Sequence, residues 1–182
     1  RIITELLEFS RTSDAALVED RIDHIIDESL SSLELRAAES SVSFCRRFDS
    51  SLPFIRSGNL FQVFSNIIRN AIEAMPDGGT LTITAQIVGD SVHIAFADQG
   101  HGLPPGGAER VFAPFFTTKP AGQGTGLGLA ICREVIEKYH GTICSDDRPE
   151  GGALITITIP LSSCQTAAGL YLPRPFTPPQ PG

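Results

Sequence analysis

The stretch GQGTGLGLAICREVIEKYH, residues 122–140, places four glycines at alternate positions directly before a helical pattern. Glycine loses more backbone entropy on folding than any other residue, so this density of glycine needs a physical reason. The Lys-Ser/Thr pair of a P-loop and the GxGxxG spacing of a dinucleotide fingerprint are both absent. What remains is a loop that ends at a helix N-terminus, where amide groups and the helix dipole attract anions. A phosphate chain would explain the missing side chains, although glycine content alone also fits a mobile surface loop.

The composition is that of one globular domain with an acidic surface. Its 182 residues are 41% hydrophobic and carry a formal net charge of −7. Such a surface repels a nucleic-acid backbone, so we expect no nucleic-acid partner and only local phosphate binding. The four cysteines lack metal-binding spacing, which favours reduced thiols in a cytoplasmic protein over zinc or disulfides. Because the chain starts at Arg1 without Met, we expect a fragment of a longer parent, which leaves a membrane anchor of that parent open.

Helical and strand patterns alternate along the chain and predict an α/β two-layer sandwich with a mixed, mostly antiparallel sheet. We expect a domain at 14–161, preceded at 1–13 by the end of another helix. Residues 162–182 read as a Pro-rich, disordered tail, since five of the 13 prolines fall in YLPRPFTPPQP, residues 171–181. Apolar spacing predicts helices over 16–38, 59–75, about 108–112 and after the glycines, and alternation predicts strands over 41–48 and 153–160 and a hairpin over 80–98.

One face of the helix predicted at 59–75 is polar. Asn66, Arg69, Asn70 and Glu73 stand at i, i+3, i+4 and i+7 and therefore share one stripe. A solvated face is the simplest explanation, but asparagine costs a helix roughly 0.5–0.7 kcal/mol relative to alanine. Two asparagines one turn apart therefore indicate a function. An amide oxygen suits Mg²⁺ when phosphates and waters supply the other ligands.

The strand predicted at the start of SVHIAFADQGHG, residues 91–102, ends in the carboxylate of Asp98. Val92, Ile94, Phe96 and Asp98 alternate onto one face, so Asp98 is expected to point inward. A buried carboxylate without a donor is costly, and the amino group of an adenine would supply one. Glycines at positions 100 and 102 would then let the backbone pass close to a base.

Taken together and in this order, five motifs resemble the N, G1, F, G2 and G3 boxes of bacterial sensor histidine kinases. They are NIIRNAIEA (66–74), DQGHGL (98–103), VFAPFFTTK (111–119), GTGLGLAI (124–131) and the GG of EGGALITITIP (150–160). These kinases belong to the GHKL ATPase superfamily, which includes gyrase, Hsp90 and MutL, so the resemblance implies a Bergerat-type fold. The short lid, residues 114–129, is most similar to the NtrB/NtrY type. ELLEFSR, residues 5–11, resembles the end of the second helix of a dimerisation and phosphotransfer domain.

The resemblance implies a role for each matched residue. Asn70 would bind the Mg²⁺ that bridges the ATP phosphates, with Asn66 helping directly or through water. Asp98 would hold the adenine amino group in a pocket shaped by Gly100 and Gly102. Arg69 and Lys119 would contact phosphates, and the catalytic group comprises Asn66, Arg69, Asn70, Glu73 and Lys119. Phe112, Phe115 and Phe116 would seat the lid, and the other nucleotide contacts would come from Phe116, Thr117, Lys119, Gly124, Thr125, Gly126, Leu127, Gly128 and Leu129.

The resemblance also implies a reaction, transfer of the γ-phosphoryl group of ATP to a histidine. None of the four histidines, His24, His93, His101 and His140, lies in an H box, so the phosphoacceptor is expected outside this chain. The implied partners are a histidine phosphotransfer and dimerisation domain and a response regulator receiver domain, and the implied parent is a homodimer. Two alternatives stay open: a superfamily ATPase that drives conformational change, and a nucleotide-binding regulatory module without catalysis.

Overall fold

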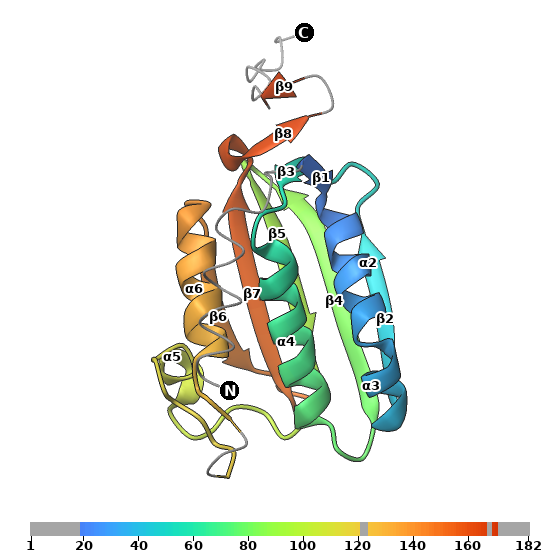
Figure 1. The fold of residues 1–182 in the computed structure, drawn as a ribbon, viewed down its shortest axis with the longest axis vertical. Helices are drawn as coiled ribbons and strands as arrows, with labels where there is room; N and C mark the ends of the chain where they lie inside the picture. Colours follow the sequence, from blue (N-terminus) through green and yellow to red (C-terminus); the bar gives the residue numbers. More distant parts are fainter. Residues whose placement is uncertain (1–18, 121–123, 167–168, 171–182) are drawn as a thin grey trace, which may run out of the picture.

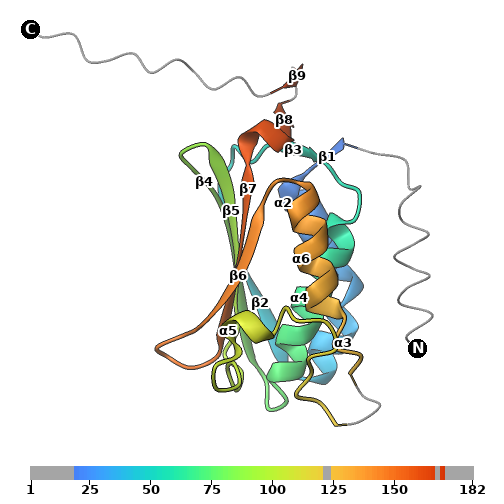
Figure 2. The ribbon, with the colours of Figure 1, turned by 90° about the vertical axis from the view of Figure 1, so that its left-hand side faces the viewer.

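A five-stranded mixed sheet forms one layer of the molecule, and helices form the other (Figures 1 and 2). The computed structural model describes residues 19–120, 124–166 and 169–170. The strand order is β2 (Val42–Phe48), β4 (Gly79–Val88), β5 (Ser91–Ala97), β7 (Ala153–Pro160) and β6 (Thr142–Asp147). Strands β2 and β4 are parallel and the remaining neighbours are antiparallel. The predicted two-layer α/β sandwich with a mixed, mostly antiparallel sheet is therefore confirmed.

The helices α2 (Ile22–Ser32), α4 (Leu60–Ala74) and α6 (Gly128–Lys138) cover one face of this sheet, as Figure 2 shows. Helix α4 lies in the middle and contacts both of the others. Its Val63, Phe64 and Ile68 are fully buried, and the ring of Phe64 packs against that of Phe96 on β5. The core thus forms because the apolar stripe of α4 meets the inward side chains of the central strands.

The strongest local patterns predict their elements correctly. The helix expected at 59–75 is α4, and the strand expected at 153–160 is β7. The predicted hairpin is formed by β4 and β5, which turn at Gly89 and Asp90. Two short strands lacked a recognisable pattern: β3 (Phe54–Arg56) and β6 at the edge of the sheet.

The helix predicted over 16–38 differs from the structure at two places in its described part. Strand β1 (Glu19–Arg21) precedes α2, because these residues pair with β3 in a second, smaller sheet. After α2 the helix breaks at Leu33 and resumes as α3 (Glu34–Glu39). The hydroxyls of Ser31 and Ser32 donate to backbone carbonyls of the preceding turn, a bonding pattern that competes with the helical ladder.

Ordered structure continues past the boundary expected at residue 161. A 3₁₀ turn, Leu161–Ser163, leads into β8 (Cys164–Thr166), which pairs with β3, and then into β9 (Gly169–Leu170). Leu161 and Cys164 are buried in the core, which explains why the chain stays attached here. The helix end expected at 1–13 and the proline-rich stretch 171–181 lie outside the described residues.

Candidate functional site

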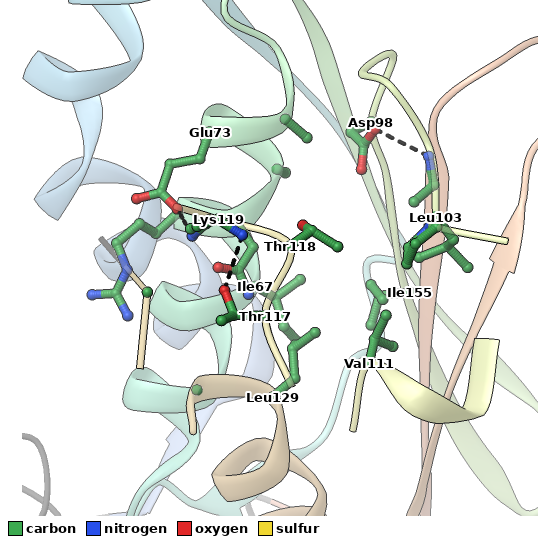
Figure 3. Close-up of a pocket in the computed structure, with 18 of the residues that line it drawn as sticks. Ile67, Glu73, Asp98, Leu103, Val111, Thr117, Thr118, Lys119, Leu129 and Ile155 are labelled. Carbon is green, nitrogen blue, oxygen red and sulfur yellow. Dashed lines mark hydrogen bonds and ion pairs between the residues drawn. The ribbon is translucent and has the colours of Figure 1, made fainter. Parts of the chain in front are cut away.

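A cavity of about 890 Å³ opens beside α4, at the end of the sheet where Asp98 follows β5 and Ala153 begins β7 (Figure 3). Its wall includes α4, the loop after β5, the segment 116–119 and the start of α6. Most of the residues predicted for a nucleotide site line it: Arg69, Asn70, Glu73, Asp98, Gly102, Phe116, Thr117, Lys119, Gly124, Thr125, Gly126, Gly128 and Leu129. Three predicted residues, Asn66, Gly100 and Leu127, lie outside this lining.

Asn66 is buried behind the cavity wall and is 3% exposed. Its side-chain oxygen accepts a hydrogen bond from the guanidinium of Arg69, and its amide lies behind Gly128 at the start of α6. The neighbouring Cys132 thiol is fully buried, and this burial raises its pKa to about 12. Asn66 on α4 therefore packs against Gly128 and Cys132 of α6. Of the two predicted asparagines, Asn70 is the one that lines the cavity.

Asp98 lies at the opposite side of the cavity from Lys119, and Figure 3 shows its carboxylate directed into the cavity. The predicted inward face of β5 is confirmed, since Val92, Ile94 and Phe96 are at most 1% exposed and Asp98 is 6% exposed. The expectation of a carboxylate without protein donors is wrong. Its Oδ1 accepts hydrogen bonds from the backbone N–H groups of Gly100 (2.8 Å) and Ala153 (3.0 Å). These two bonds fix the carboxylate from behind.

The turn between β6 and β7 holds Asp98 in place. The Arg148 guanidinium donates to the backbone carbonyl of Asp98, and Gly152 has a φ of +88°. A Cβ at Gly152 would come closer to that same carbonyl than real Cβ atoms come to backbone. This explains the second glycine of the GG pair as a packing requirement directly under Asp98.

The described glycines of the stretch 122–128, which are Gly124, Gly126 and Gly128, do not all meet the same steric requirement. A side chain at Gly126 would collide with the backbone of Phe115, and one at Gly124 would collide with the Thr117 hydroxyl. These two glycines therefore let the chain pack against the segment before it. Gly128 differs, because a Cβ there would have only ordinary contacts of 3.9 Å with Asn66. Gly100 is also required by packing, because a Cβ there would collide with the backbone carbonyl of Ala74 at the end of α4.

Helix α6 begins at this cavity with Gly128 as its first residue. Among the described residues no side chain caps its N-terminus by a hydrogen bond. The amide groups of its first turn are therefore available to an anion in the cavity, and the helix dipole favours negative charge there.

One carboxylate joins two cations at the cavity wall. Glu73 on α4 pairs through one oxygen with Arg36 of α3 at 2.6 Å and through the other with Lys119. Figure 3 shows Glu73 and Lys119 facing each other. Arg36 also lines the cavity, although no sequence motif pointed to it. Its involvement depends on an ion pair between residues 37 positions apart, which local patterns do not reveal.

The aromatic residues of the predicted lid take different positions. Phe112 is buried under the guanidinium of Arg133, and Phe116 lines the cavity under that of Arg110. Phe115 is 70% exposed and adopts a φ of +65°, so it does not anchor the segment to the core. The apolar part of the cavity is completed by three residues to which the sequence had assigned no role, although they lie within or beside the motifs: Leu103, Val111 and Ile155.

The donor set fits a Mg²⁺ that arrives with a phosphate ligand. Asn70 offers one amide oxygen at the cavity, and Mg²⁺ ordinarily keeps several waters and phosphate oxygens in its coordination shell. Over the part of the chain that the structure describes, no cluster of three His, Cys, Asp or Glu residues has the arrangement of a metal site.

Within the same ranges, no helix is long and apolar enough to cross a bilayer.

Comparisons with known proteins point to one family. Residues 56–163 match the family described as histidine kinase-, DNA gyrase B-, and HSP90-like ATPase. Over 162 residues the chain is 35% identical to Sporulation kinase A of Bacillus subtilis (strain 168), an alignment that covers 87% of this chain and 26% of that protein. Across three such curated relatives the chain spans between 22% and 36% of their length.

Solved structures of the same kind share the fold. The nucleotide-free catalytic domain of histidine kinase ThkA has a TM-score of 0.70 and 32% identity, covering 79% of this chain and 94% of that one. ThkA in complex with the response regulator protein TrrA has a TM-score of 0.66 and 26% identity, covering 87% of this chain and 49% of that one.

Proposed function

Because the chain belongs to the family of histidine kinase-, DNA gyrase B- and HSP90-like ATPases, we propose that it is the ATP-binding catalytic domain of a two-component sensor histidine kinase. Its reaction is transfer of the γ-phosphoryl group of ATP to a histidine of a separate phosphotransfer domain. The single observation that carries this proposal is the division of the cavity. The buried Asp98 lies on one side, and Lys119 lies on the other, paired with Glu73 of α4, the helix that also carries Asn70.

The two sides of the cavity suit the two parts of ATP. Asp98 is an acceptor fixed in orientation, so it suits the amino group of adenine. On the other side, Arg69, Lys119 and the N-terminus of α6 supply donors and positive charge for the phosphates. A Mg²⁺ held by Asn70 would supply further neutralisation of phosphate charge. Phosphoryl transfer leaves the protein little covalent chemistry, so these residues act by positioning and by charge.

Within this function we assign the chain to the NtrB/NtrY type, on the basis of the short lid at 114–129. The proposed partners are a histidine phosphotransfer and dimerisation domain and a response regulator receiver domain, in a homodimeric parent whose catalytic part is cytoplasmic. Similarity to ThkA, which is solved in complex with a response regulator, supports this second partner.

The alternative of an ATPase is disfavoured because Asn66 occupies the position of the water-activating glutamate of the hydrolysing relatives. A neutral amide cannot take a proton from water.

The test uses the purified chain with γ-labelled ATP and Mg²⁺, alone and with a separate phosphotransfer domain that carries an H box. We expect slow ATP hydrolysis, because Asn66 cannot activate water, and no label on the chain alone, because none of its histidines lies in an H box. With the added domain, acid-labile phosphate should appear on that domain. A domain whose acceptor histidine is changed to glutamine is the matched control. Label on the chain alone, or hydrolysis at the same rate as transfer, would contradict the proposal.

A further inference from the structure

The phosphate side of the cavity contains one carboxylate among its cations. Glu73 lies one helical turn beyond Asn70 on α4, and both line the same cavity. Both oxygens of Glu73 are engaged, one with Arg36 and the other with Lys119. The Glu73 side chain is 24% exposed, against 48% for Arg36 and 37% for Lys119. The carboxylate is thus the more shielded member of both pairs.

We propose that Glu73 is an internal stand-in for the triphosphate: it holds Arg36 and Lys119 in the empty cavity, and the phosphates of the nucleotide take both cations from it. This inference rests on the proposed function, and it adds Arg36 to the residues that contact phosphate. Guanidinium and ammonium groups bind carboxylate and phosphate through the same charge-assisted hydrogen bonds. The two anions therefore compete for the same donors.

The position of Glu73 makes the competition unavoidable. Side chains one turn apart on a helix are separated by about 5–6 Å, so phosphate oxygens near Asn70 lie close to the Glu73 carboxylate. Like charges at that distance repel, and a cation between them is drawn to the anion of higher charge. A triphosphate carries more charge than one carboxylate. Glu73 therefore lowers nucleotide affinity in two ways, by repulsion and by occupying the cations.

Transfer of Lys119 from Glu73 to the phosphates also affects the packing around Gly124. The backbone N–H of Lys119 bonds to the Thr117 hydroxyl at 3.1 Å, and the same hydroxyl and Lys119 side chain lie against Gly124. Release of Lys119 from Glu73 therefore loosens the packing that orders residues 117–119 in the empty cavity.

The experiment measures binding of a non-hydrolysable ATP analogue with Mg²⁺ by calorimetry, with adenosine as the phosphate-free reference. Glu73→Gln keeps the shape and removes the charge, and we expect it to tighten analogue binding about three- to tenfold, the range of one or two partly exposed ion pairs. Adenosine affinity should stay unchanged. Glu134→Gln, at a surface pair with Lys138 on α6, is the matched control and should change neither affinity. Unchanged or weaker analogue binding by Glu73→Gln would overturn the proposal.

A double-mutant cycle separates cation exchange from simple removal of negative charge. If Glu73 competes for Lys119, the gain from Glu73→Gln should be smaller in a Lys119→Met background, where only repulsion and competition for Arg36 remain. A full gain in that background would overturn the exchange mechanism. Hydrogen exchange of the empty chain gives a readout independent of nucleotide: Glu73→Gln should speed exchange at residues 117–119, and unchanged exchange would also count against the stand-in role. Failure of the wild-type chain to bind adenosine and analogue alike would instead refute the proposed function, and this inference with it.

Discussion

At the scale of single residues, the two sides of the cavity differ in how their key side chain is fixed. Asp98 is held from behind by two backbone N–H groups, so its orientation does not depend on the ligand. Asn70 on α4 is less buried than Asp98: it is half-buried and lines the cavity. The first arrangement suits recognition of a base with a fixed hydrogen-bonding pattern. The second suits an ion that brings ligands of its own.

Replacing Asp98 by asparagine should weaken adenine nucleotide binding about 10- to 100-fold, the cost of a lost hydrogen bond to a charged group. The oxygen of asparagine would still satisfy Gly100 and Ala153, which turns its NH₂ toward the adenine amino group. Calorimetry with ATP measures the effect, and the exposed Asp77→Asn is the control. GTP should bind the wild-type chain poorly, and equal affinity for ATP and GTP would argue against this pocket.

Replacing Asn70 by alanine should remove most of the phosphotransfer activity while the fold survives. Alanine is the better helix former by roughly 0.5–0.7 kcal/mol, so the free energy of unfolding should not fall. Transfer to a supplied phosphotransfer domain measures activity, and urea denaturation measures stability. Wild-type transfer by this variant in Mg²⁺ would mean that α4 does not hold the metal.

At the scale of elements, the turn between β6 and β7 positions Asp98, which directly follows β5. Gly151 and Gly152 are adjacent and both have a positive φ, of +93° and +88°. A Cβ on Gly151 would meet no described atom within 4 Å, whereas one on Gly152 would meet the carbonyl of Asp98. Gly151 is therefore required only by its positive φ, whereas Gly152 is required both by its positive φ and by its close approach to Asp98.

We expect Gly151→Ala to cost about 1–2 kcal/mol of stability, the penalty for a left-handed alanine. Gly152→Ala should cost more, about 2–4 kcal/mol, because the backbone must also move away from Asp98. The displaced Asp98 should lower ATP affinity in Gly152→Ala but not in Gly151→Ala. Urea denaturation and calorimetry on both variants measure these effects. Equal stability of the two variants would show that the close approach to Asp98 carries no cost.

At the scale of the whole molecule, the sequence predicts what is local and misses what depends on distant pairing. Helix α4 and the β4–β5 hairpin have complete patterns within their own residues, and both were predicted. Strand β8 exists because Cys164 pairs with Ile55 of β3, more than 100 residues away, so composition alone suggested a tail. The site divides in the same way. Asn70 and Asp98 lie in motifs, whereas Arg36 lies in none and lines the cavity from α3, where it pairs with Glu73.

Burial of thiols in this core should make stability depend on alkaline pH. Burial raises the pKa of Cys132 from 9.0 to about 12, and that of Cys164 to about 11. Both thiols stay protonated in the folded chain at pH 10, while the unfolded chain releases these protons above pH 9. A raised folded pKa contributes stability below the unfolded pKa, and this contribution is lost as pH rises between 9 and 12.

The expected loss is about 1.4 kcal/mol per buried thiol at pH 10, one unit above the unfolded pKa. Urea denaturation of the reduced chain at pH 8 and pH 10 measures it, and Cys132→Ala removes one of the two contributions. This variant should be less stable than wild type at pH 8, because it leaves a cavity, but its loss between pH 8 and pH 10 should be smaller by that amount. Cys144→Ala, at an exposed position on β6, should change the slope far less. Identical pH slopes for wild type and Cys132→Ala would mean that the Cys132 thiol ionises as readily in the folded chain as in the unfolded one.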